Sequence, residues 1–381
     1  MNIVYMLNIF ISAMPLQAES YTKQDFIYAE LLKRITTGIC PIDALMPTEQ
    51  ELAAEFRCSR GTVGRAIMRL VQEGLVARKP HEGTRVIRGT AAHTLPSLDL
   101  DACAFVYPSD QHEGVWRTAR GFQQAAHGVK RRTMMLSAGT DFRKEAEIVG
   151  RLGEFNVKGA VLFPVITNPT EMAFYSQMIL ACPFPVVLAE LTIPGMGRSS
   201  VAVDGLHAGY TMTRHLIDQG LRRIGFLAHY AWAPFIRDRY MGYRQALEEA
   251  GIAENQDWVL LESRMNPDFE DPLAEPTRIA QSYLDRNSKM EGVVCASDFM
   301  ALGLLQAAQN RGLNVPGDLK ITGVDDYEIA ATASVPLTTY RVSYETLGGK
   351  AFDLLNAQMS AGSHSSTESL VRGAIVIRES A

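Results

Sequence analysis

Residues 47–86, PTEQELAAEFRCSRGTVGRAIMRLVQEGLVARKPHEGTRV, constrain the fold of this chain more than any other stretch. Thr48 and Glu51 form a T-x-x-E capping box, in which the hydroxyl and the carboxylate each accept a backbone amide at the start of a helix. The segment RCS interrupts that helix, and its serine, Ser59, is a good N-cap for a second helix. Gly74 is placed to end the second helix as its C′ glycine. The pattern therefore predicts two short helices joined by a tight turn.

The second helix has one apolar face and one polar face. Its apolar residues follow the i, i+3, i+4, i+7, i+8 spacing of a buried stripe, namely Val63, Ala66, Ile67, Leu70 and Val71. At about 100° per residue, the opposite face carries Gly61, Thr62, Arg65 and Arg69. Residues 75–77 and 84–87 then read as two short strands around the loop 79–83. Helix, turn, helix and hairpin together are typical of a winged helix-turn-helix.

Charge agrees with this interpretation. Between residues 57 and 88, eight Arg and Lys stand against two acids, a local charge of +6 in a chain of net charge −5. A basic patch on an acidic protein is typical of a surface that binds a polyanion. A helix with small, hydroxyl and Arg side chains outward can enter the major groove of DNA. A charge run alone would also fit a solvated helical hairpin, but the caps, the apolar face and the wing together favour DNA binding.

The stretch resembles the DNA-binding domain of the GntR family over about residues 21–88. The matching segments are MPTEQELA, SRGTVGRA, RLVQEGLV and EGTRV. One position departs from the family pattern, because Gly64 stands where the family has an Arg after the TV pair, and Arg65 follows it. The resemblance implies that a base-reading role at this position is lost or has passed to Arg65. We therefore expect operator preferences that differ from those of the family.

The expected DNA contacts come from the second helix, its preceding capping box and the wing. Arg side chains can fork to guanine, and Thr side chains reach a base edge or a phosphate. The candidate residues are Thr48, Arg60, Gly61, Thr62, Arg65, Arg69, Lys79, His81 and Gly83.

Length and cysteine usage predict a multidomain protein of a reducing compartment. A chain of 381 residues is long enough for two or three domains. Its five Cys are scattered, odd in number and never in C-x-x-C spacing, which argues against a disulfide framework or a zinc site.

The chain begins with a tail, residues 1–19, whose apolar and uncharged part, residues 1–14, is too short to span a bilayer and has no basic n-region. We expect a disordered tail there, or a start codon assigned too far upstream, with Met14 as an alternative start. The DNA-binding domain then covers 20–88. A linker over 89–101 follows, because this segment is polar, small and contains Pro96.

From residue 102 onward, apolar strand-like runs alternate with amphipathic helices, which predicts an α/β fold with βαβ units and parallel sheets. The expected strands are 102–107, 133–137, 159–163, 186–191, 201–203, 224–228, 258–261, 292–295, 319–324 and 374–377. These are too many for one small sheet. A set before residue 203 and a similar set after it predict two similar lobes.

This region resembles the effector-binding domain of the LacI/GalR family over about residues 101–381. The motifs are HLIDQGLRRIGF, RYMGYRQAL, VVCASDFMALG, ITGVDD and PLTT. The resemblance implies a type I periplasmic-binding-protein fold, with lobe 1 at about 102–203 and 336–365 and lobe 2 at about 204–335 and 366–381. The GntR-type domain replaces the LacI-type N-terminal helices. The arrangement is similar to that of arabinose-repressor-like chimeras.

Ligands of open α/β sheets bind at the carboxyl ends of the strands, and several polar residues fall there. The resemblance implies that Arg239 and Asp298 bind the effector and that Glu190 is an acidic sugar contact. Arg239 is expected at the start of a helix, where the dipole does not favour a cation, so binding of hydroxyls or a carboxylate is a better reason for it than a surface role. Asp298 begins a helix and could equally be a plain N-cap.

Four further residues complete the expected effector site. Tyr107, Ser109 and Asp110 lie at or after the end of the first strand and could line the cleft. Asp325 lies at another strand end, although a structural role suits it as well. An Arg with carboxylates and aromatic rings is a set that binds polyols, because rings pack on sugar C–H surfaces and acids accept from hydroxyls.

We therefore expect a cytoplasmic transcriptional regulator, a repressor, that binds operator DNA as a homodimer and a sugar effector between its lobes. Closure of the lobes would couple the two affinities reciprocally. The chain has no G-x-S-x-G, no Walker-type loop and no G-x-G-x-x-G, and its His residues show no metal spacing, so we expect no enzyme, cofactor, metal or membrane partner. Two alternatives remain: an α/β enzyme with an accessory helix-turn-helix, and an exported solute-binding protein.

Overall fold

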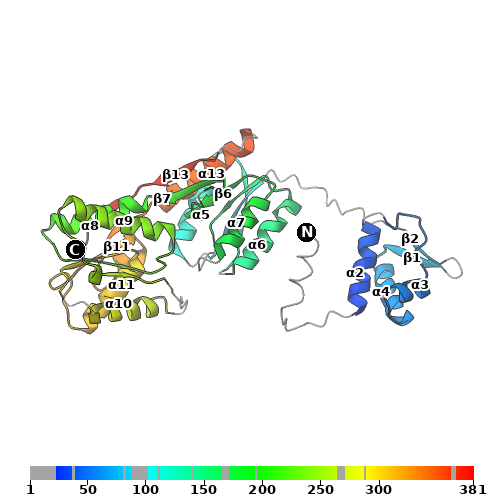
Figure 1. Cartoon of the computed structure of the whole chain (residues 1–381). Helices are drawn as coiled ribbons and strands as arrows, with labels where there is room; N and C mark the ends of the chain where they lie inside the picture. The colour runs from blue at the N-terminus through cyan, green and yellow to red at the C-terminus, as the bar shows by residue number, and fades with distance from the viewer. Residues whose placement is uncertain are drawn as a thin grey trace. The chain divides into compact units, whose positions relative to one another are not determined.

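The computed structural model describes residues 23–36, 39–79, 83–87, 102–109, 112–139, 141–164, 171–193, 195–263, 271–286, 289–361 and 366–381. The chain divides into two compact units, Met1–Ser97 and Leu98–Ala381, each of which is described by itself (Figure 1). The expected tail 1–19 and the expected linker 89–101 lie outside the described residues. Within the described ranges, every helix is too short or too polar to cross a membrane.

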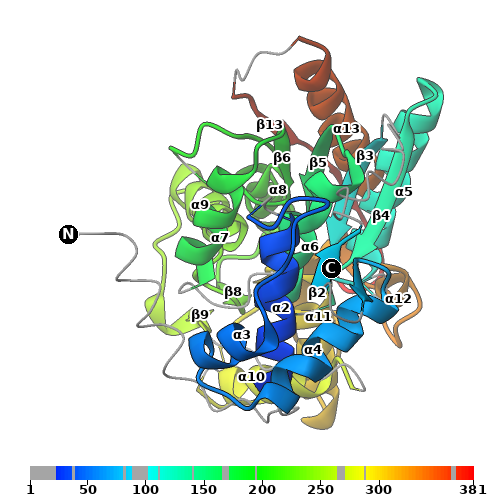
Figure 2. The same ribbon diagram turned by 90° about the vertical axis from the view of Figure 1, so that its right-hand side faces the viewer.

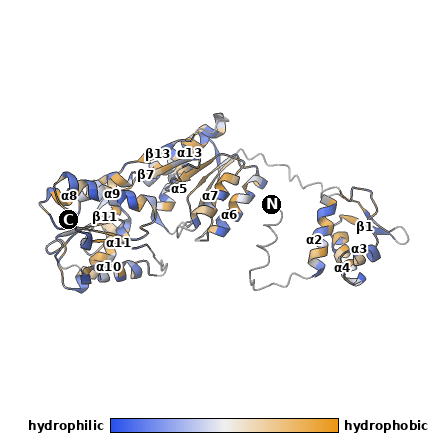
Figure 3. Cartoon of the chain, viewed as in Figure 1, coloured by the Kyte–Doolittle hydropathy of each residue, from blue (hydrophilic) through white to orange (hydrophobic). Residues whose placement is uncertain are grey.

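The first unit is a helical core with a β-hairpin. Its described elements are α2 (Lys23–Thr36), α3 (Glu49–Glu55), α4 (Arg60–Gln72), β1 (Val76–Lys79) and β2 (Gly83–Val86). The predicted apolar face of α4 is buried except for Val71, which is partly buried, and it packs with Leu31 of α2 and Leu52 of α3 in one core. Figure 3 shows these helices with both hydrophobic and hydrophilic positions, as expected for helices that bury one face.

The local boundaries of this unit follow the predicted capping chemistry. The backbone amide of Thr48 donates to the Glu51 carboxylate at 2.7 Å, and the Glu51 amide donates to the Thr48 hydroxyl at 3.3 Å. Ser59 caps α4 by accepting the Thr62 amide at 3.2 Å. Gly74, just past the end of α4, has a φ of +69°, the left-handed conformation that glycine adopts without strain. The capping box, the second N-cap and the C′ glycine are all confirmed.

The second unit contains two six-stranded sheets, which define two lobes. Lobe 1 has the strand order β13-β7-β6-β5-β3-β4, and all its pairings are parallel. Lobe 2 has the order β14-β12-β11-β10-β8-β9, parallel except for the pairing of β14 with β12. The predicted two-lobed parallel α/β fold is confirmed. The strands are β3 (Ala102–Tyr107), β4 (Arg132–Ser137), β5 (Gly159–Leu162), β6 (Val186–Ala189), β7 (Ser199–Val203), β8 (Ile224–Ala228), β9 (Val259–Leu261), β10 (Gly292–Cys295), β11 (Lys320–Asp325), β12 (Thr338–Arg341), β13 (Glu368–Val371) and β14 (Ala374–Val376).

Helices cover both faces of each sheet, so the central strands are buried on both sides. In lobe 1, α5 and α13 pack side by side (Figure 2), and in lobe 2 the corresponding pair is α8 and α9. The helices of this unit are α5 (Glu113–Gly128), α6 (Phe142–Arg151), α7 (Glu171–Ala181), α8 (Gly205–Asp218), α9 (Pro234–Glu249), α10 (Ala274–Arg286), α11 (Asp298–Asn310), α12 (Glu328–Ala331) and α13 (Tyr344–Ala361), with 3-10 turns η1 (Leu152–Phe155) and η2 (Gln256–Trp258).

Near its C-terminus the chain crosses twice between the lobes, and both crossings differ in position from the expected lobe boundaries. The expected boundaries put residues 338–341 in lobe 1, but they form β12, which pairs with β11 in lobe 2. They put residues 368–371 in lobe 2, but these form β13, which pairs with β7 in lobe 1. The chain therefore returns to lobe 1 between β12 and α13, and leaves it again between β13 and β14. The physical reason is that strand pairing is decided by partners far away in the sequence, which local patterning does not specify.

Candidate functional site

The outward face of α4 carries the arginines that the sequence predicts for DNA. Arg60, Gly61 and Arg65 are exposed, whereas Val63 and Ile67 on the opposite face are buried. The first turn of α4 contains no acidic residue. The positive end of its dipole suits a phosphate group. This end of α4 can therefore meet the DNA backbone while its arginines reach base edges.

The two threonines predicted to contact DNA already make hydrogen bonds at the N-termini of α3 and α4. The Thr48 hydroxyl donates to the Glu51 carboxylate at 2.9 Å, in addition to capping α3. The Thr62 hydroxyl lies 2.8 Å from the hydroxyl of Ser59, the N-cap of α4. A DNA contact from Thr48 must therefore share the oxygen that caps α3, and one from Thr62 must share an oxygen that is bonded to the cap of α4.

The wing presents two of its predicted contacts. Lys79 and Gly83 are exposed and form the last paired positions of the hairpin before its tip. Gly83 has a φ of +88°, which favours glycine at this position. His81 lies outside the described residues.

Arg69 differs from the other predicted DNA residues because it packs against α2. Its guanidinium lies 3.9 Å from the centre of the Tyr28 ring, and its Nε lies 3.5 Å from the Glu73 carboxylate. The Tyr28 hydroxyl also donates to Glu73 at 2.6 Å. A cation over an aromatic ring is a stabilising contact of about 1 kcal/mol. The structure therefore gives Arg69 a role in joining α4 to α2.

Gly64, the position that departs from the GntR pattern, faces α3. A Cβ atom there would lie 3.3 Å from the Glu49 carboxylate, and that carboxylate is paired with Arg78 of β1 at 2.9 Å. The space beside Gly64 thus holds an acid bridged to the wing. An arginine at this position would meet that acid.

In the second unit, Arg239 lies at the centre of a buried polar cluster. Its Nη1 donates to the carbonyl of Ala296 at 2.5 Å, and its Nη2 lies 3.5 Å from the Asp325 carboxylate. The same Asp325 oxygen accepts the Tyr344 hydroxyl at 2.9 Å. Gly209 of α8 makes this position possible, since a Cβ there would lie 1.8 Å from the Arg239 carbonyl oxygen. Arg239 and Asp325, both predicted from the sequence, are brought together.

The predicted place of Arg239 at the start of a helix is wrong. Helix α9 begins at Pro234, so Arg239 lies in its second turn and is only 4% exposed. The pairing with Asp325, rather than the end of a helix dipole, accounts for a buried cation here.

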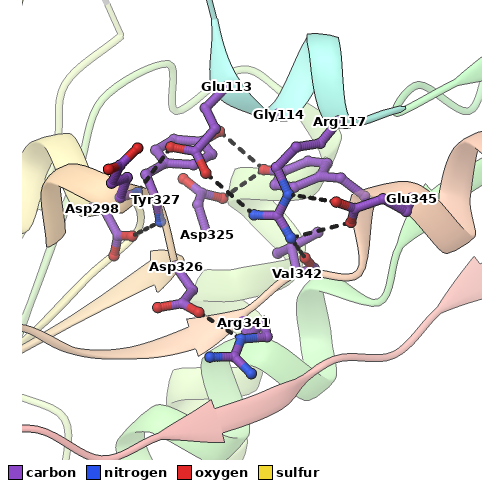
Figure 4. A network of polar contacts seen from close by, with 12 residues as sticks. Glu113, Gly114, Arg117, Asp298, Asp325, Asp326, Tyr327, Arg341, Val342 and Glu345 are labelled. Atoms are coloured by element: carbon purple, nitrogen blue, oxygen red, sulfur yellow. Dashed lines mark hydrogen bonds and ion pairs between the residues drawn. The ribbon is translucent and has the colours of Figure 1, made fainter. Parts of the chain in front are cut away.

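Asp298 is fully buried, and both its oxygens are engaged by the protein. One accepts the Tyr327 amide at 3.0 Å and the other accepts the Thr339 hydroxyl at 2.6 Å. Figure 4 shows Asp298 beside Tyr327, with Asp325 close by. The N-cap of α11 is Ser297, so Asp298 is not the cap that the sequence left open as an alternative. Its two bonds tie α11 to the segment after β11 and to β12, which makes Asp298 a support of the cluster.

Glu190 reaches the cluster from lobe 1. It follows β6 with a φ of +66°, and its Oε1 is buried with no hydrogen-bond partner in the described part of the chain. Burial raises the pKa of this carboxyl to about 7, and the charge of Arg239 partly opposes that rise. Burial, partly offset by Arg239, likewise raises the pKa of Asp325 to about 6.

The other expected residues of lobe 1 lie where β3 ends. Tyr107 is half-buried and packs against Phe105, with ring centroids 5.8 Å apart. Ser109 is also half-buried. Asp110 lies outside the described residues. Tyr107 and Ser109 thus remain candidates by position.

Two residues of this site were missed from the sequence. His229 and Trp232 lie between β8 and α9, and His229 Nδ1 and Trp232 Nε1 are buried without a hydrogen-bond partner among the described residues. Burial, reinforced by Arg239, lowers the pKa of His229 to about 3, so the ring is neutral. The rule that selected Glu190 and Asp325 would have found them, because they too follow the carboxyl end of a parallel strand.

The lobes touch at the rim of this site. The Glu328 amide of lobe 2 donates to the Glu113 carboxylate of lobe 1 at 2.8 Å. The His112 ring of lobe 1 packs edge-on against Tyr327, with centroids 5.5 Å apart. The polar cluster therefore lies between the carboxyl ends of two sheets whose lobes are in contact, as in a binding cleft that closes.

Comparison with known proteins agrees with both halves of this description. Residues 23–86 match the family of bacterial regulatory proteins, gntR family, and residues 213–381 match the periplasmic binding protein-like domain. The chain joins a GntR-family domain to a periplasmic-binding-protein-like domain. Over 346 residues it is 25% identical to the arabinose metabolism transcriptional repressor of Geobacillus stearothermophilus, covering 86% of this chain and 88% of that protein.

Two further similarities support the same assignment. The chain is 32% identical over 210 residues to the ribose operon repressor of Haemophilus influenzae, covering 55% of this chain and 61% of the repressor. A solved structure of the transcriptional regulator CelR in complex with cellobiose shares the fold, with a TM-score of 0.64 at 22% identity, covering 88% of this chain and 100% of that one. Both relatives are named as repressors, and the solved structure is that of a transcriptional regulator.

Proposed function

We propose that this regulator is a repressor whose affinity for operator DNA is set by a carbohydrate effector bound between lobes 1 and 2. The observation that carries the proposal is the set of buried polar atoms without partners, Glu190 Oε1, His229 Nδ1, Trp232 Nε1 and Arg239 Nε, in the described part of the chain. A buried polar group left unpaired costs about 1–3 kcal/mol, so these atoms favour a ligand rich in hydrogen-bonding groups. The relatives named for arabinose and ribose point to the same class.

The first unit supplies the DNA contacts. We assign base reading to Arg65, and phosphate or groove contacts to Arg60, Gly61 and Thr62 at the start of α4. Lys79, His81 and Gly83 of the wing, with Thr48 beside it, contribute further backbone contacts. Arg69 is assigned to the packing of the domain, because it lies over Tyr28.

The proposed assembly is a cytoplasmic homodimer. A regulator must reach chromosomal DNA, and the proposed cytoplasmic location follows from that proposed role. Two copies would bring two winged helices to adjacent half-sites of an operator, as two-fold symmetric regulators do. A change in lobe closure would alter the spacing of those two domains, and by linkage operator DNA would change effector affinity by the same factor.

A thermal-shift screen tests the effector class directly. The full chain is titrated with L-arabinose, D-ribose, cellobiose and a panel of other neutral mono- and disaccharides. A ligand at 100 times its Kd stabilises the folded state by about 2.7 kcal/mol, which raises the unfolding midpoint measurably. One sugar that raises the midpoint in proportion to its concentration supports the proposal. The absence of any shift across the panel, with intact binding to DNA, would contradict it.

A further inference from the structure

The cation of the proposed effector site is already neutralised by the protein. Arg239 directs one nitrogen to Asp325 at 3.5 Å and another to the carbonyl of Ala296 at 2.5 Å. A guanidinium that binds a phosphate or carboxylate ligand uses its forked nitrogens for that purpose. Here both terminal nitrogens are engaged, and the Nε, on the other edge of the group, is left unpaired in the described part of the chain. The Nε–H of Arg239 is therefore a donor open to a ligand, on a guanidinium whose charge is paired with Asp325.

Acidic groups outnumber cations around this arginine. Glu190 and Asp325 both interact electrostatically with Arg239, whose charge partly opposes the rise in the pKa of each carboxyl. Burial, and after it the charge of the neighbouring Asp325, raises the pKa of Asp298 to about 7. Three carboxyl groups therefore lie around one guanidinium, and the described residues give this site no surplus of positive charge. A second anion brought into it would meet like charge and pay its own desolvation.

The unpaired atoms offer neutral hydrogen bonding from both lobes. Glu190 lies at the carboxyl end of β6 in lobe 1, and His229 and Trp232 lie at the carboxyl end of β8 in lobe 2. The indole of Trp232 can only donate, the neutral His229 ring has one donor and one acceptor, and Glu190 can accept from a hydroxyl. The Tyr230 ring lies edge-on to Trp232, with centroids 6.4 Å apart, and adds an aromatic surface.

We infer that the effector is an uncharged polyhydroxylated molecule, held by Glu190 from one lobe and by His229 and Trp232 from the other, and that phosphorylated or oxidised sugars are rejected. This inference rests on the proposed function and narrows its ligand class. Hydroxyls satisfy both donors and acceptors, whereas a phosphate supplies acceptors alone. The site thereby separates a free sugar from its phosphorylated or acidic derivative.

Isothermal titration calorimetry of the full chain at pH 7.5 tests the inference with matched pairs. The pairs are D-ribose with D-ribose 5-phosphate, D-glucose with D-glucose 6-phosphate, L-arabinose with L-arabinonate, and cellobiose with cellobionate. The neutral member of at least one pair is expected to bind about tenfold or more tightly than its charged partner, a conservative figure for like-charge rejection. A charged member that binds as tightly as its neutral partner, or more tightly, overturns the inference and leaves the carbohydrate function standing. Failure of every sugar to bind contradicts the proposed function itself.

Single substitutions test which residues bind the neutral sugar and which discriminate against its charged partner. Glu190→Gln keeps the shape of the side chain but removes its charge, so it should reduce the discrimination against the charged member of the pair. Trp232→Phe removes the indole donor and should lower the affinity for the neutral sugar by about fivefold or more, the loss expected for one buried hydrogen bond. Trp116→Phe, on the exposed surface of α5, is the matched control and should leave affinity unchanged. The unfolding midpoint of each variant without ligand verifies folding, and unchanged binding by folded Trp232→Phe overturns its assigned contact.

Discussion

The backbone amide of Glu328 in lobe 2 donates a hydrogen bond of 2.8 Å to the carboxylate of Glu113 in lobe 1. The other oxygen of Glu113 lies 3.5 Å from Arg117, which is itself paired with Glu345 at 3.1 Å (Figure 4). A charged acceptor for a backbone amide is among the stronger hydrogen bonds in proteins. This contact therefore favours the arrangement in which the lobes meet.

Removal of this contact should weaken effector binding without unfolding the protein. Glu113→Ala is expected to raise the Kd of the effector about tenfold, because a hydrogen bond to a charged group contributes about 1.5–3 kcal/mol and closure of the lobes would lose it. Calorimetry with the sugar found in the screen measures this. Glu154→Ala, which removes an exposed acid of lobe 1, is the control and should bind normally. Equal affinities of the two variants would show that the Glu113–Glu328 bond does not bear on closure.

Asp298 should behave as a structural residue. Asp298→Ala leaves the Tyr327 amide and the Thr339 hydroxyl without their acceptor, so the free energy of unfolding should fall by about 3 kcal/mol. Thr339→Val removes only one of the two bonds and should cost about 1 kcal/mol. Denaturant unfolding measures both. If Asp298→Ala keeps full stability but no longer binds the effector, Asp298 is a direct ligand contact instead.

Arg65 and Arg69 lie on the same predicted face of α4 but should respond differently. Arg65→Ala should weaken binding to the preferred operator by about 1–3 kcal/mol and relax the preference at one base pair. Arg69→Ala should instead lower the stability of the domain by about 1 kcal/mol, through loss of the contact with Tyr28. Fluorescence anisotropy with the operator and with single-base variants, beside thermal unfolding, separates these effects. Loss of base discrimination in Arg69→Ala but not in Arg65→Ala would reverse the assignment.

Gly64 offers a gain-of-function test. Gly64→Arg restores the residue of the GntR pattern and should change the preferred operator sequence, with little loss of stability because the nearby Glu49 oxygen belongs to a flexible side chain. Gly64→Ala is the control: it should stabilise the helix by about 0.5–1 kcal/mol and keep the original preference. Selection of binding sites from a randomised DNA pool compares the variants. The same preferred sequence for all three proteins would show that this position does not read bases.

The pKa of Glu190, raised to about 7 mainly by burial, makes stability depend on pH. The unfolded chain releases this proton near pH 4.5, and the folded chain keeps it until about pH 7, so stability from this group is present at low pH and falls as pH rises between the two values. Relative to Glu190→Gln, the native chain should lose up to about 3 kcal/mol between pH 4.5 and pH 8. Chemical unfolding of both proteins across this range measures the difference. A constant difference would mean that Glu190 titrates at its ordinary pKa.

The sequence was informative where structure depends on neighbours along the chain. The capping box at Thr48, the cap at Ser59 and the C′ glycine Gly74 are local features, and each is present. The buried strands of the second unit could also be predicted, since continuous apolar runs between helices allow few other folds. Strands β12 and β13 were missed because Thr338–Arg341 and Glu368–Val371 are short and partly polar, and only their partners β11 and β7 define them.

The candidate site was predicted in position but not in detail. Arg239 and Asp325 meet as a pair, and Glu190 acts on that arginine. The role of Asp298 depends on groups 29 and 41 residues away along the chain, which no local pattern specifies. His229 and Trp232 also follow the carboxyl end of a parallel strand, so the same positional rule could have included them. Their buried nitrogens without a partner among the described residues, which distinguish them from ordinary buried side chains, are visible only in the structure.

The central claim is that one chain couples DNA binding by the first unit to ligand binding in the second. The most direct measurement starts from genomic fragments that the purified full-length chain enriches, and titrates the best fragment by fluorescence anisotropy with and without the sugar found in the screen. We expect specific binding whose Kd changes about tenfold or more at saturating sugar, within the usual range of allosteric coupling, while binding to unrelated DNA does not change. The same Kd with and without a sugar that calorimetry shows to be bound would contradict it.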